Sequence, residues 1–349
     1  MFEVARVWWV MLTQVGPMGR SSRAAEWWMR YYVCEALRQE GLFDYLQDAR
    51  NYGQIVAHFG YVDSPYTRQV LETLTIDRNN LLVKQGERYR RNPKESLPTL
   101  GEVRRRAPKV FDRISMWEDF AGRIPARMRQ EPTDFVHRFE QEGPAVLSFD
   151  RSLNRGIYTA LRRAAFAYID LRELRGKRLL DVACGSGYET GDIWAWLDGD
   201  VQITAVDPVP GLLELAEKHF AEAAAKYGDG EAMLLTGANR PTFHLMSACD
   251  LDFPDESFDV IFHSLLLHWT PDPARAVREV ARVLKPGGMV LGTQICKPTA
   301  GPYMSLITRV HENVYGYFEQ EDLFRWYERA GVQLSMVTPA GVFKGRKRL

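Results

Sequence analysis

The segment Arg178–Tyr188, RLLDVACGSGY, decides the fold of this chain. Leucine and valine form a short strand that ends at Val182, a turn rich in small residues follows, and a helical pattern continues to Leu197. Strand, glycine-rich turn and helix are the first unit of a doubly wound α/β sheet. Glycine in such a turn lets the backbone approach a ligand at the start of the helix. The sequence therefore predicts a ligand site around Gly185 and Gly187.

The segments after this unit alternate between strand and helix patterns. Strands are expected at 201–206, 242–247, 258–263 and 289–294, and helices at 211–227 and 273–283, with LKPGG at 284–288 as a turn. A helix at 320–330 and strands at 332–338 and near Val342 can close the sheet in the antiparallel sense. The expected fold is a Rossmann-like, seven-stranded mixed sheet with helices on both sides.

Acidic residues stand at the ends of two of these strands. Asp181 lies in the first strand, and Asp207 directly follows the second, 26 residues later. A carboxylate at the end of the second strand can accept hydrogen bonds from both hydroxyls of a ribose. The pattern therefore predicts a ligand that contains a nucleoside.

The motifs DVACGSG, AVD, ACDLDFPDESFDVIF, LLLHW and ARVLKPGG follow one another over about residues 178–340. In this order and spacing they resemble the class I S-adenosylmethionine-dependent methyltransferases, and the resemblance implies that enzyme activity and that cofactor. An NAD-dependent dehydrogenase is the competing interpretation, but its GxGxxG fingerprint would have glycine at Thr190, and Glu189 would crowd a pyrophosphate. A sulfonium amino acid carries no phosphate, so it fits this turn better.

The resemblance implies a role for each motif residue. Asp181, Gly185 and Gly187 would surround the methionine part of the cofactor, and Ala183 stands where many members have the first glycine. Asp207 would bind the ribose, Asp250 the adenine amino group and the backbone of Leu251 the adenine ring. His263 and Ser264 would face the cofactor from the acceptor side. The full implied cofactor set is Asp181, Ala183, Gly185, Gly187, Asp207, Pro208, Asp250, Leu251, His263 and Ser264.

Methyl transfer from a sulfonium is an in-line displacement, so the protein mainly positions the acceptor and excludes water. His263 and His268 are the candidates for a general base, although a structural role is the alternative for each. The segment LGTQICKP offers Gln294 but no histidine, which argues against a strict histidine base for O-methylation. The candidates for the acceptor pocket are Trp117, Tyr158, Tyr188, Trp269 and His311.

The N-terminal part predicts a winged helix: a helix at 24–40, a capped helix from Ser64 to Thr75, and a hairpin around Gln85–Glu87. Such a module either binds DNA or builds a dimer beside an active site. Its last helix is not strongly basic, so we expect a homodimer rather than nucleic-acid binding. The expected domains are a winged-helix domain at 1–100, long helices forming a linker and lid at 101–172, and the cofactor domain at 173–349.

Composition adds several exclusions. The formal net charge of zero divides into +8 for residues 1–178 and −8 for residues 179–349, which supports two regions with different roles. The four cysteines are far apart, so we expect no disulfides and a reducing, cytoplasmic location. Because no cluster has metal-ligand spacing and no apolar run reaches about 18 residues, we expect neither a metal nor a transmembrane segment.

Three hypotheses for the function follow. The first is methylation of an apolar small molecule, aromatic or polyketide-like, at oxygen or carbon. The second is methylation of a lipid or isoprenoid quinone, suggested by the tryptophan-rich start and the basic tail 344–348. The third is a DNA-binding regulator that senses the cofactor. Product partitioning separates the first two, and a DNA shift assay tests the third.

Overall fold

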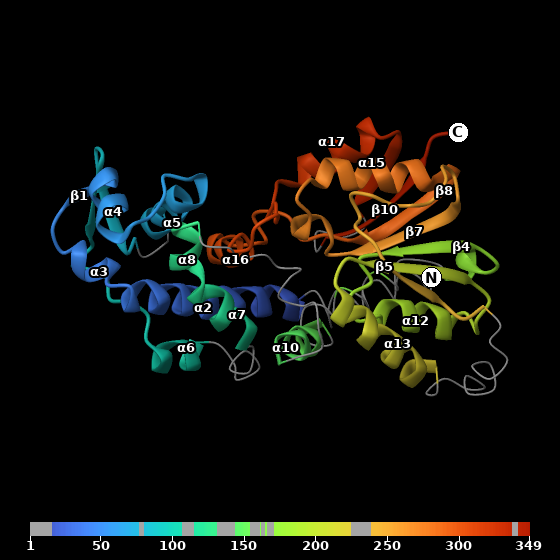
Figure 1. Cartoon of the computed structure of the whole chain (residues 1–349), viewed down its shortest axis with the longest axis horizontal. Coiled ribbons are helices and arrows are strands. Elements are labelled where there is room, and N and C mark those ends of the chain that lie inside the picture. The colour runs from blue at the N-terminus through green and yellow to red at the C-terminus, as the bar shows by residue number, and fades with distance from the viewer. Residues whose placement is uncertain are drawn as a thin grey trace. The chain divides into compact units, whose positions relative to one another are not determined.

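The computed structural model describes residues 16–76, 80–106, 115–130, 144–153, 161, 165, 171–224, 239–336 and 341–349 (Figure 1). Contacts among these residues form two compact units. One unit lies within residues 1–19, 136–299 and 317–349, and the other lies within residues 20–135 and 300–316, so that α2 begins in the first unit and continues in the second.

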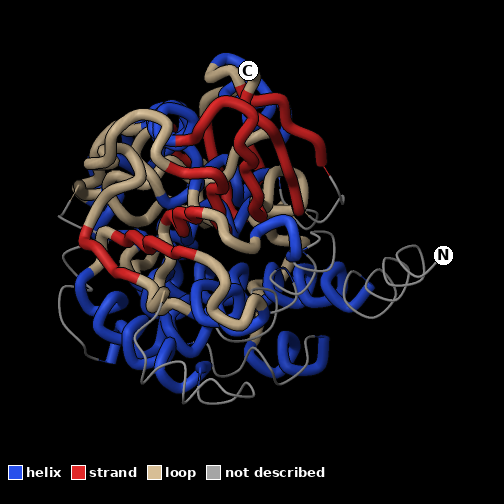
Figure 2. The backbone as a smooth tube through the Cα atoms, turned by 90° about the vertical axis from the view of Figure 1, so that its right-hand side faces the viewer, coloured by secondary structure: helices blue, strands red, loops and turns tan. Residues whose placement is uncertain are grey.

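The first unit, called the sheet unit, is built on seven hydrogen-bonded strands (Figure 2). In spatial order they are β6 (Thr242–Leu245), β5 (Gln202–Asp207), β4 (Arg178–Val182), β7 (Phe258–Ser264), β8 (Leu284–Thr293), β10 (Val342–Lys347) and β9 (Val332–Met336). The strands from β6 to β8 are parallel, and β10 is antiparallel to both of its neighbours. The predicted seven-stranded mixed sheet is therefore confirmed.

Helices cover both faces of this sheet. They are α10 (Pro144–Leu153), η3 (Leu171–Leu174), α12 (Tyr188–Trp196), α13 (Pro210–Ala224), η4 (Leu267–Trp269), α15 (Pro273–Val283) and α17 (Gln320–Arg329). One buried apolar cluster joins Ile261 to residues of α15 and α17, and another joins Val260 to residues of α12 and α13. Neighbouring residues of β7 thus face opposite layers, as the two-residue period of a strand requires.

The LKPGG segment differs from its predicted turn. Residues from Leu284 onward already belong to β8, and the pairing between β7 and β8 is irregular between Phe258 and Val260. This irregularity lets Leu284 pair with Phe258 although the regular ladder resumes at Met289. Gly287 and Gly288, which the sequence placed in a turn after the helix, therefore lie in a bulged part of β8.

The second unit, called the N-terminal unit, combines helices with a small sheet. Its elements are α2 (Gly16–Gln39), α3 (Leu42–Tyr45), β1 (Arg50–Asn51), α4 (Tyr52–Phe59), α5 (Pro65–Ile76), β2 (Leu82–Gln85), β3 (Arg88–Arg91), α6 (Leu100–Arg106), α7 (Ser115–Gly122), α8 (Ile124–Met128) and α16 (Pro302–Thr308). The predicted hairpin is present as β2 and β3, and β1 pairs with the other edge of β3. The winged-helix interpretation itself stays a prediction.

Four α-helices lie in the described part of residues 100–172, and the expectation of long helices there stays a prediction. The helices α6, α7, α8 and α10 have 7, 8, 5 and 10 residues. Gly122 ends α7, and Pro125 sits in the first turn of α8, where its missing N–H costs no hydrogen bond. Glycine and proline therefore separate α7 from α8.

One helix from the C-terminal half folds with the N-terminal unit. The Glu26 carboxylate accepts hydrogen bonds from the backbone N–H groups of Tyr303, at 2.8 Å, and Met304, at 3.2 Å, at the start of α16. The Tyr66 hydroxyl donates to the Leu306 carbonyl at 3.1 Å. A carboxylate at a helix start satisfies N–H groups that have no partner within the helix. The proposed domain boundaries at residues 100 and 172 stay predictions.

The apolar start of the chain at residues 4–15 lies outside the described residues. Within the described part of α2, Trp28 is buried, at 1% exposure, and its ring packs near Tyr32 at 5.6 Å between ring centroids. Among the described residues, no helix is both long enough and apolar enough to cross a membrane.

Candidate cofactor and acceptor site

The turn after β4 has an unusual backbone that suits close approach of a ligand. Ala183, Gly185 and Gly187 all have positive φ angles, of 60°, 54° and 74°. A Cβ atom at Gly187 would lie 2.8 Å from the Cβ atom of Ala216 in α13, so this position has no room for a side chain. The predicted glycine turn is thus held tightly between β4 and α13, and its backbone borders the ends of β4 and β5.

Asp207 ends β5 and fixes this turn. One of its carboxylate oxygens accepts the Gly185 N–H at 2.9 Å, and the other accepts the Val209 N–H at 2.9 Å, across the intervening Pro208. The side chain is 5% exposed, and burial raises its pKa to about 6, although both backbone hydrogen bonds lower it. Each carboxylate oxygen can still accept one more hydrogen bond, which is what a ribose with two hydroxyls requires.

The unfolding free energy should report this buried carboxylate. The pKa of Asp207 is about 6 in the folded chain and near 3.8 when exposed, so the folded state holds the proton more tightly. The protonated Asp207 therefore stabilises the folded state below about pH 4. As the pH rises from about 4 to above 6, the free energy of unfolding should fall by up to about 3 kcal/mol. Urea unfolding of the chain and of Asp207→Asn should show a stability difference that changes between pH 4 and 6. A difference independent of pH would contradict the assignment.

Asp181 lies in β4 beside this turn. It is buried, and the Thr190 hydroxyl of α12 donates to its carboxylate at 2.5 Å. Thr190 occupies the position at which a dinucleotide fingerprint would have its last glycine. Its hydroxyl therefore has a structural partner in Asp181, and its side chain fills space next to the turn.

Asp250 and Leu251 follow β6 and differ sharply in exposure. The Asp250 side chain is 86% exposed and lies 3.9 Å from the Arg275 guanidinium. The Leu251 N–H donates to the Glu279 carboxylate at 3.0 Å, and its carbonyl accepts from Arg282 at 2.7 Å. Asp250 is free to approach an adenine amino group, whereas a contact from the Leu251 amide would compete with Glu279.

His263 occupies a position that does not suit the general base predicted for it. Its ring is fully buried, and its Nε2 atom lies 2.5 Å from the Tyr327 hydroxyl of α17, beside the Phe343 ring. Burial lowers the pKa of His263 to about 3. A neutral ring packed between β7 and α17 explains this histidine as part of the core. The next residue, Ser264, shares a hydrogen bond of 2.7 Å with the Thr293 hydroxyl.

His268 lies in η4, just after β7, and Gln294 sets its protonation. The Gln294 side-chain oxygen accepts the Leu267 N–H at 3.1 Å, so its amide nitrogen faces the Nδ1 atom of His268 at 3.1 Å. Nδ1 therefore accepts a hydrogen bond, and in the neutral ring the proton sits on Nε2. Because burial lowers the pKa of His268 to about 3, the ring is neutral at physiological pH. His268 can donate a hydrogen bond from Nε2, but it is not arranged as a base.

The helix α10 contacts both the glycine turn and the segment around His268. The sequence analysis did not assign this helix to the site. Phe149 meets the Trp269 ring edge to face, with ring centroids 6.1 Å apart, next to His268. Leu153, one turn later, would lie 3.2 Å from a Cβ atom placed on Gly185. Asp150 is buried and lies 3.7 Å from the Nδ1 atom of His219 in α13. No short-range pattern links α10 to a turn that follows it later in the chain.

The predicted acceptor residues fall into both units. In the sheet unit, Tyr188 stacks on the His219 ring, with centroids 4.4 Å apart, and Trp269 contacts Phe149. In the N-terminal unit, Trp117 lies in α7, and the buried His311 ring meets Phe120 of the same helix edge to face. Tyr158 lies outside the described residues. The structure thus brings Tyr188 and Trp269 to the carboxyl ends of the strands, whereas Trp117 and His311 belong to the N-terminal unit.

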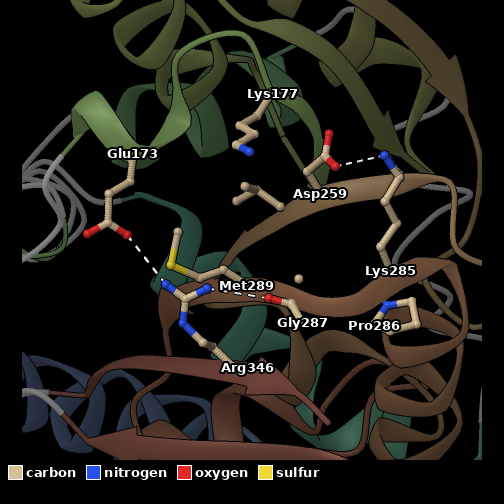
Figure 3. A pocket seen from close by; sticks show the side chains of 10 residues that line it. Glu173, Lys177, Asp259, Lys285, Pro286, Gly287, Met289 and Arg346 are labelled. Atoms are coloured by element: carbon tan, nitrogen blue, oxygen red, sulfur yellow. Dashed lines mark hydrogen bonds and ion pairs between the residues drawn. The ribbon is translucent and has the colours of Figure 1, made fainter. Parts of the chain in front are cut away.

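A cavity of about 410 Å³ lies at the amino-terminal ends of the central strands, where β4, β7 and β8 begin (Figure 3). Two ion pairs line it: Lys285 with Asp259 at 2.7 Å, and Arg346 with Glu173 at 3.6 Å. Asp207 and the glycine turn lie at the carboxyl ends of the strands. The cavity is therefore not part of the candidate site. Within the described residues, no cluster of histidine, cysteine and acidic side chains could hold a metal ion.

Comparisons with known proteins identify a methyltransferase domain in this chain. Residues 180–292 match the family model described as a methyltransferase domain. The chain is 32% identical over 116 residues to a malonyl-[acyl-carrier protein] O-methyltransferase from Serratia marcescens, a match that covers 33% of this chain and 37% of that protein. It is 32% identical over 138 residues to 27-O-demethylrifamycin SV methyltransferase from Amycolatopsis mediterranei, with coverage of 39% and 46%. The chain thus spans less than half the length of these two relatives.

A solved structure resembles the whole chain. The crystal structure of the CurJ carbon methyltransferase aligns with a TM-score of 0.70 and 14% sequence identity. The alignment covers 99% of this chain and 96% of that chain. At this level of identity the match shows a shared fold that includes the N-terminal unit as well as the sheet unit.

Proposed function

Because this chain carries a class I S-adenosylmethionine-dependent methyltransferase domain, we propose that it methylates an apolar small molecule, aromatic or polyketide-like, at oxygen or carbon. The relatives that support this act, by their names, on an acyl-carrier-bound malonyl group and on a rifamycin. Because the chain shares its fold with a carbon methyltransferase, we include carbon as well as oxygen among the acceptor atoms.

The arrangement of Asp207 and the glycine turn carries the proposal. Asp207 holds the turn through Gly185 and keeps an acceptor site on each oxygen for a ribose. The close packing of Gly187 against Ala216 of α13 fixes the turn at the start of α12, where the amino-acid end of the cofactor would lie. Bound S-adenosylmethionine supplies a methyl group on a sulfonium, which is an activated leaving group.

His268 defines the acceptor side. A neutral ring with its proton on Nε2 orients an acceptor oxygen by donating a hydrogen bond. It does not remove a strongly held proton, so the acceptor must ionise easily, as a phenol or an enolised carbonyl does. Hydrogen bonding to such an oxygen holds either that oxygen or the carbon next to the carbonyl in line with the methyl group. The nearby Trp269 and Tyr188 rings would pack against an apolar acceptor.

Two further features belong to this proposal. We infer a homodimer that forms through the N-terminal unit, as the resemblance implies. A lipid or isoprenoid quinone is the alternative acceptor, but Trp28, one of the tryptophans that suggested it, belongs to the core.

Product analysis tests the function directly. The purified chain, incubated with methyl-labelled S-adenosylmethionine, should transfer label to a phenol, a β-ketoacyl thioester or a prenylated hydroquinone offered in parallel. Label in the phenol or thioester, with the position of the methyl group read by NMR, supports the proposal. Transfer to the prenylated hydroquinone alone favours the alternative, and absence of S-adenosylhomocysteine binding in calorimetry would exclude both.

A further inference from the structure

The helix α10 brings an acidic side chain to the glycine turn. Asp150 lies in α10, which packs on α13, and it is 7% exposed. Leu153, on the same helix, reaches Gly185, and the Nδ1 atom of His219 lies 2.8 Å from the Ser186 carbonyl. Asp150 and Ser186, which are buried, and His219, which is partly buried, therefore form one cluster, called the α10 cluster, around the middle of the turn.

Two polar groups of the α10 cluster lack hydrogen bonds. The Oδ1 atom of Asp150 and the hydroxyl of Ser186, which is 1% exposed, make none among the described residues. Buried polar groups normally have partners, because leaving a carboxylate in a low-dielectric environment without one is costly. A ligand that supplies donors would remove this cost.

His219 does not satisfy Asp150. Its Nδ1 atom is close enough to the Ser186 carbonyl that it must donate its proton there. The separation of 3.7 Å from Nδ1 to Asp150 is beyond a hydrogen bond. On its other side, the Tyr188 hydroxyl lies 3.4 Å from the Nε2 atom of His219. His219 thus positions the turn, and the carboxylate of Asp150 can pair with a cationic group of a ligand.

We propose that Asp150 binds the α-ammonium group of the methyl donor. This assignment rests on the proposed function, because it places the amino-acid end of the cofactor at the Gly185–Gly187 turn. Asp207 at the end of β5 would hold the nucleoside end, and the α10 cluster would hold the other. A carboxylate pairs with an ammonium group, and the unpartnered Ser186 hydroxyl can donate to the neighbouring α-carboxylate.

Binding measurements with two ligands test this assignment without turnover. S-adenosylhomocysteine carries the α-ammonium group, whereas 5′-methylthioadenosine has the same nucleoside and lacks the amino-acid end. Asp150→Asn should weaken S-adenosylhomocysteine binding about 10- to 100-fold, the loss expected for a hydrogen bond between charged groups. Binding of 5′-methylthioadenosine should change less than about twofold. The matched control Arg151→Gln, an exposed position on the same helix, should leave both affinities unchanged.

The two ligands also separate the possible failures. Equal losses for both ligands in Asp150→Asn would show that Asp150 only supports the fold, and no loss for either would show that it does not face the cofactor. Either result overturns the assignment while the proposed function stands. If the unaltered chain binds neither ligand, the proposed function fails, and the assignment fails with it. A thermal melt of each variant confirms that the comparison concerns folded protein.

Discussion

Replacing Asp207 by alanine should weaken S-adenosylhomocysteine binding by about 100-fold or more. The carboxylate would accept two ribose hydroxyls, and each hydrogen bond to a charged group contributes about 1.5–3 kcal/mol. The same carboxylate also accepts the Gly185 and Val209 N–H groups, so its loss loosens the turn that holds the other end of the ligand. Isothermal titration calorimetry of the chain and the variant measures this change directly.

Asp250 provides the matched control for this prediction. It is an aspartate in the loop after the neighbouring strand β6, but it is 86% exposed, where solvent weakens its interactions. Asp250→Ala should therefore reduce affinity less than about 10-fold. If Asp207→Ala retained affinity within a few-fold of the original chain while its circular dichroism spectrum stayed native, Asp207 would not bind the ribose, and the placement of the cofactor along this turn would be wrong.

Replacing Gln294 by glutamate should lower kcat about 10- to 100-fold near neutral pH. Gln294 donates a hydrogen bond to the Nδ1 atom of His268, whereas a glutamate carboxylate would accept a hydrogen bond from Nδ1–H and so favour the tautomer that is protonated there. The ring would then lose its Nε2 proton and, with it, the hydrogen bond to the acceptor oxygen, which contributes about 1.5–3 kcal/mol when that oxygen is charged. A neighbouring carboxylate would also raise the pKa of His268 from about 3, so a new ionisation should appear in the pH–rate profile.

The opposite outcome has a clear meaning. A glutamate at position 294 that increases kcat would identify His268 as a general base, because the carboxylate supports a ring with a free Nε2 lone pair. His268→Ala, measured alongside, should lower kcat without changing S-adenosylhomocysteine affinity, since this ring belongs to the acceptor side. A parallel fall in cofactor affinity would assign His268 to the cofactor site instead.

The sequence predicts the sheet unit well where local patterns are complete. The strand Arg178–Val182 and the helix Pro273–Val283 have the predicted bounds. The helix begins where Asp272 accepts the Arg275 N–H and proline occupies its first turn, which are local signals. Asp207 is likewise identifiable because it directly ends a strand. Features of this kind depend on residues that are close together in the chain.

The position of His263 could not be predicted for a physical reason. Four residues of β7, Val260–His263, are all buried, because helices cover both faces of a parallel sheet. A strand that is apolar on both faces does not show in its sequence which side chains point toward α17. The sequence therefore places His263 on the acceptor side, whereas in the structure it contacts Tyr327. The role of α10 escapes prediction for a related reason, because its contacts with Gly185 and Trp269 are tertiary.

The placement of α16 has a consequence for how the chain is synthesised. Tyr303–Thr308 are all buried, and Glu26 and Tyr66 bond to their backbone, yet these residues leave the ribosome long after residues 20–135. The N-terminal unit therefore lacks part of its core until most of the sheet unit has been translated. Contacts between distant residues slow folding and prolong the exposure of apolar surface. During synthesis, the first half of this chain depends on the second half to complete it.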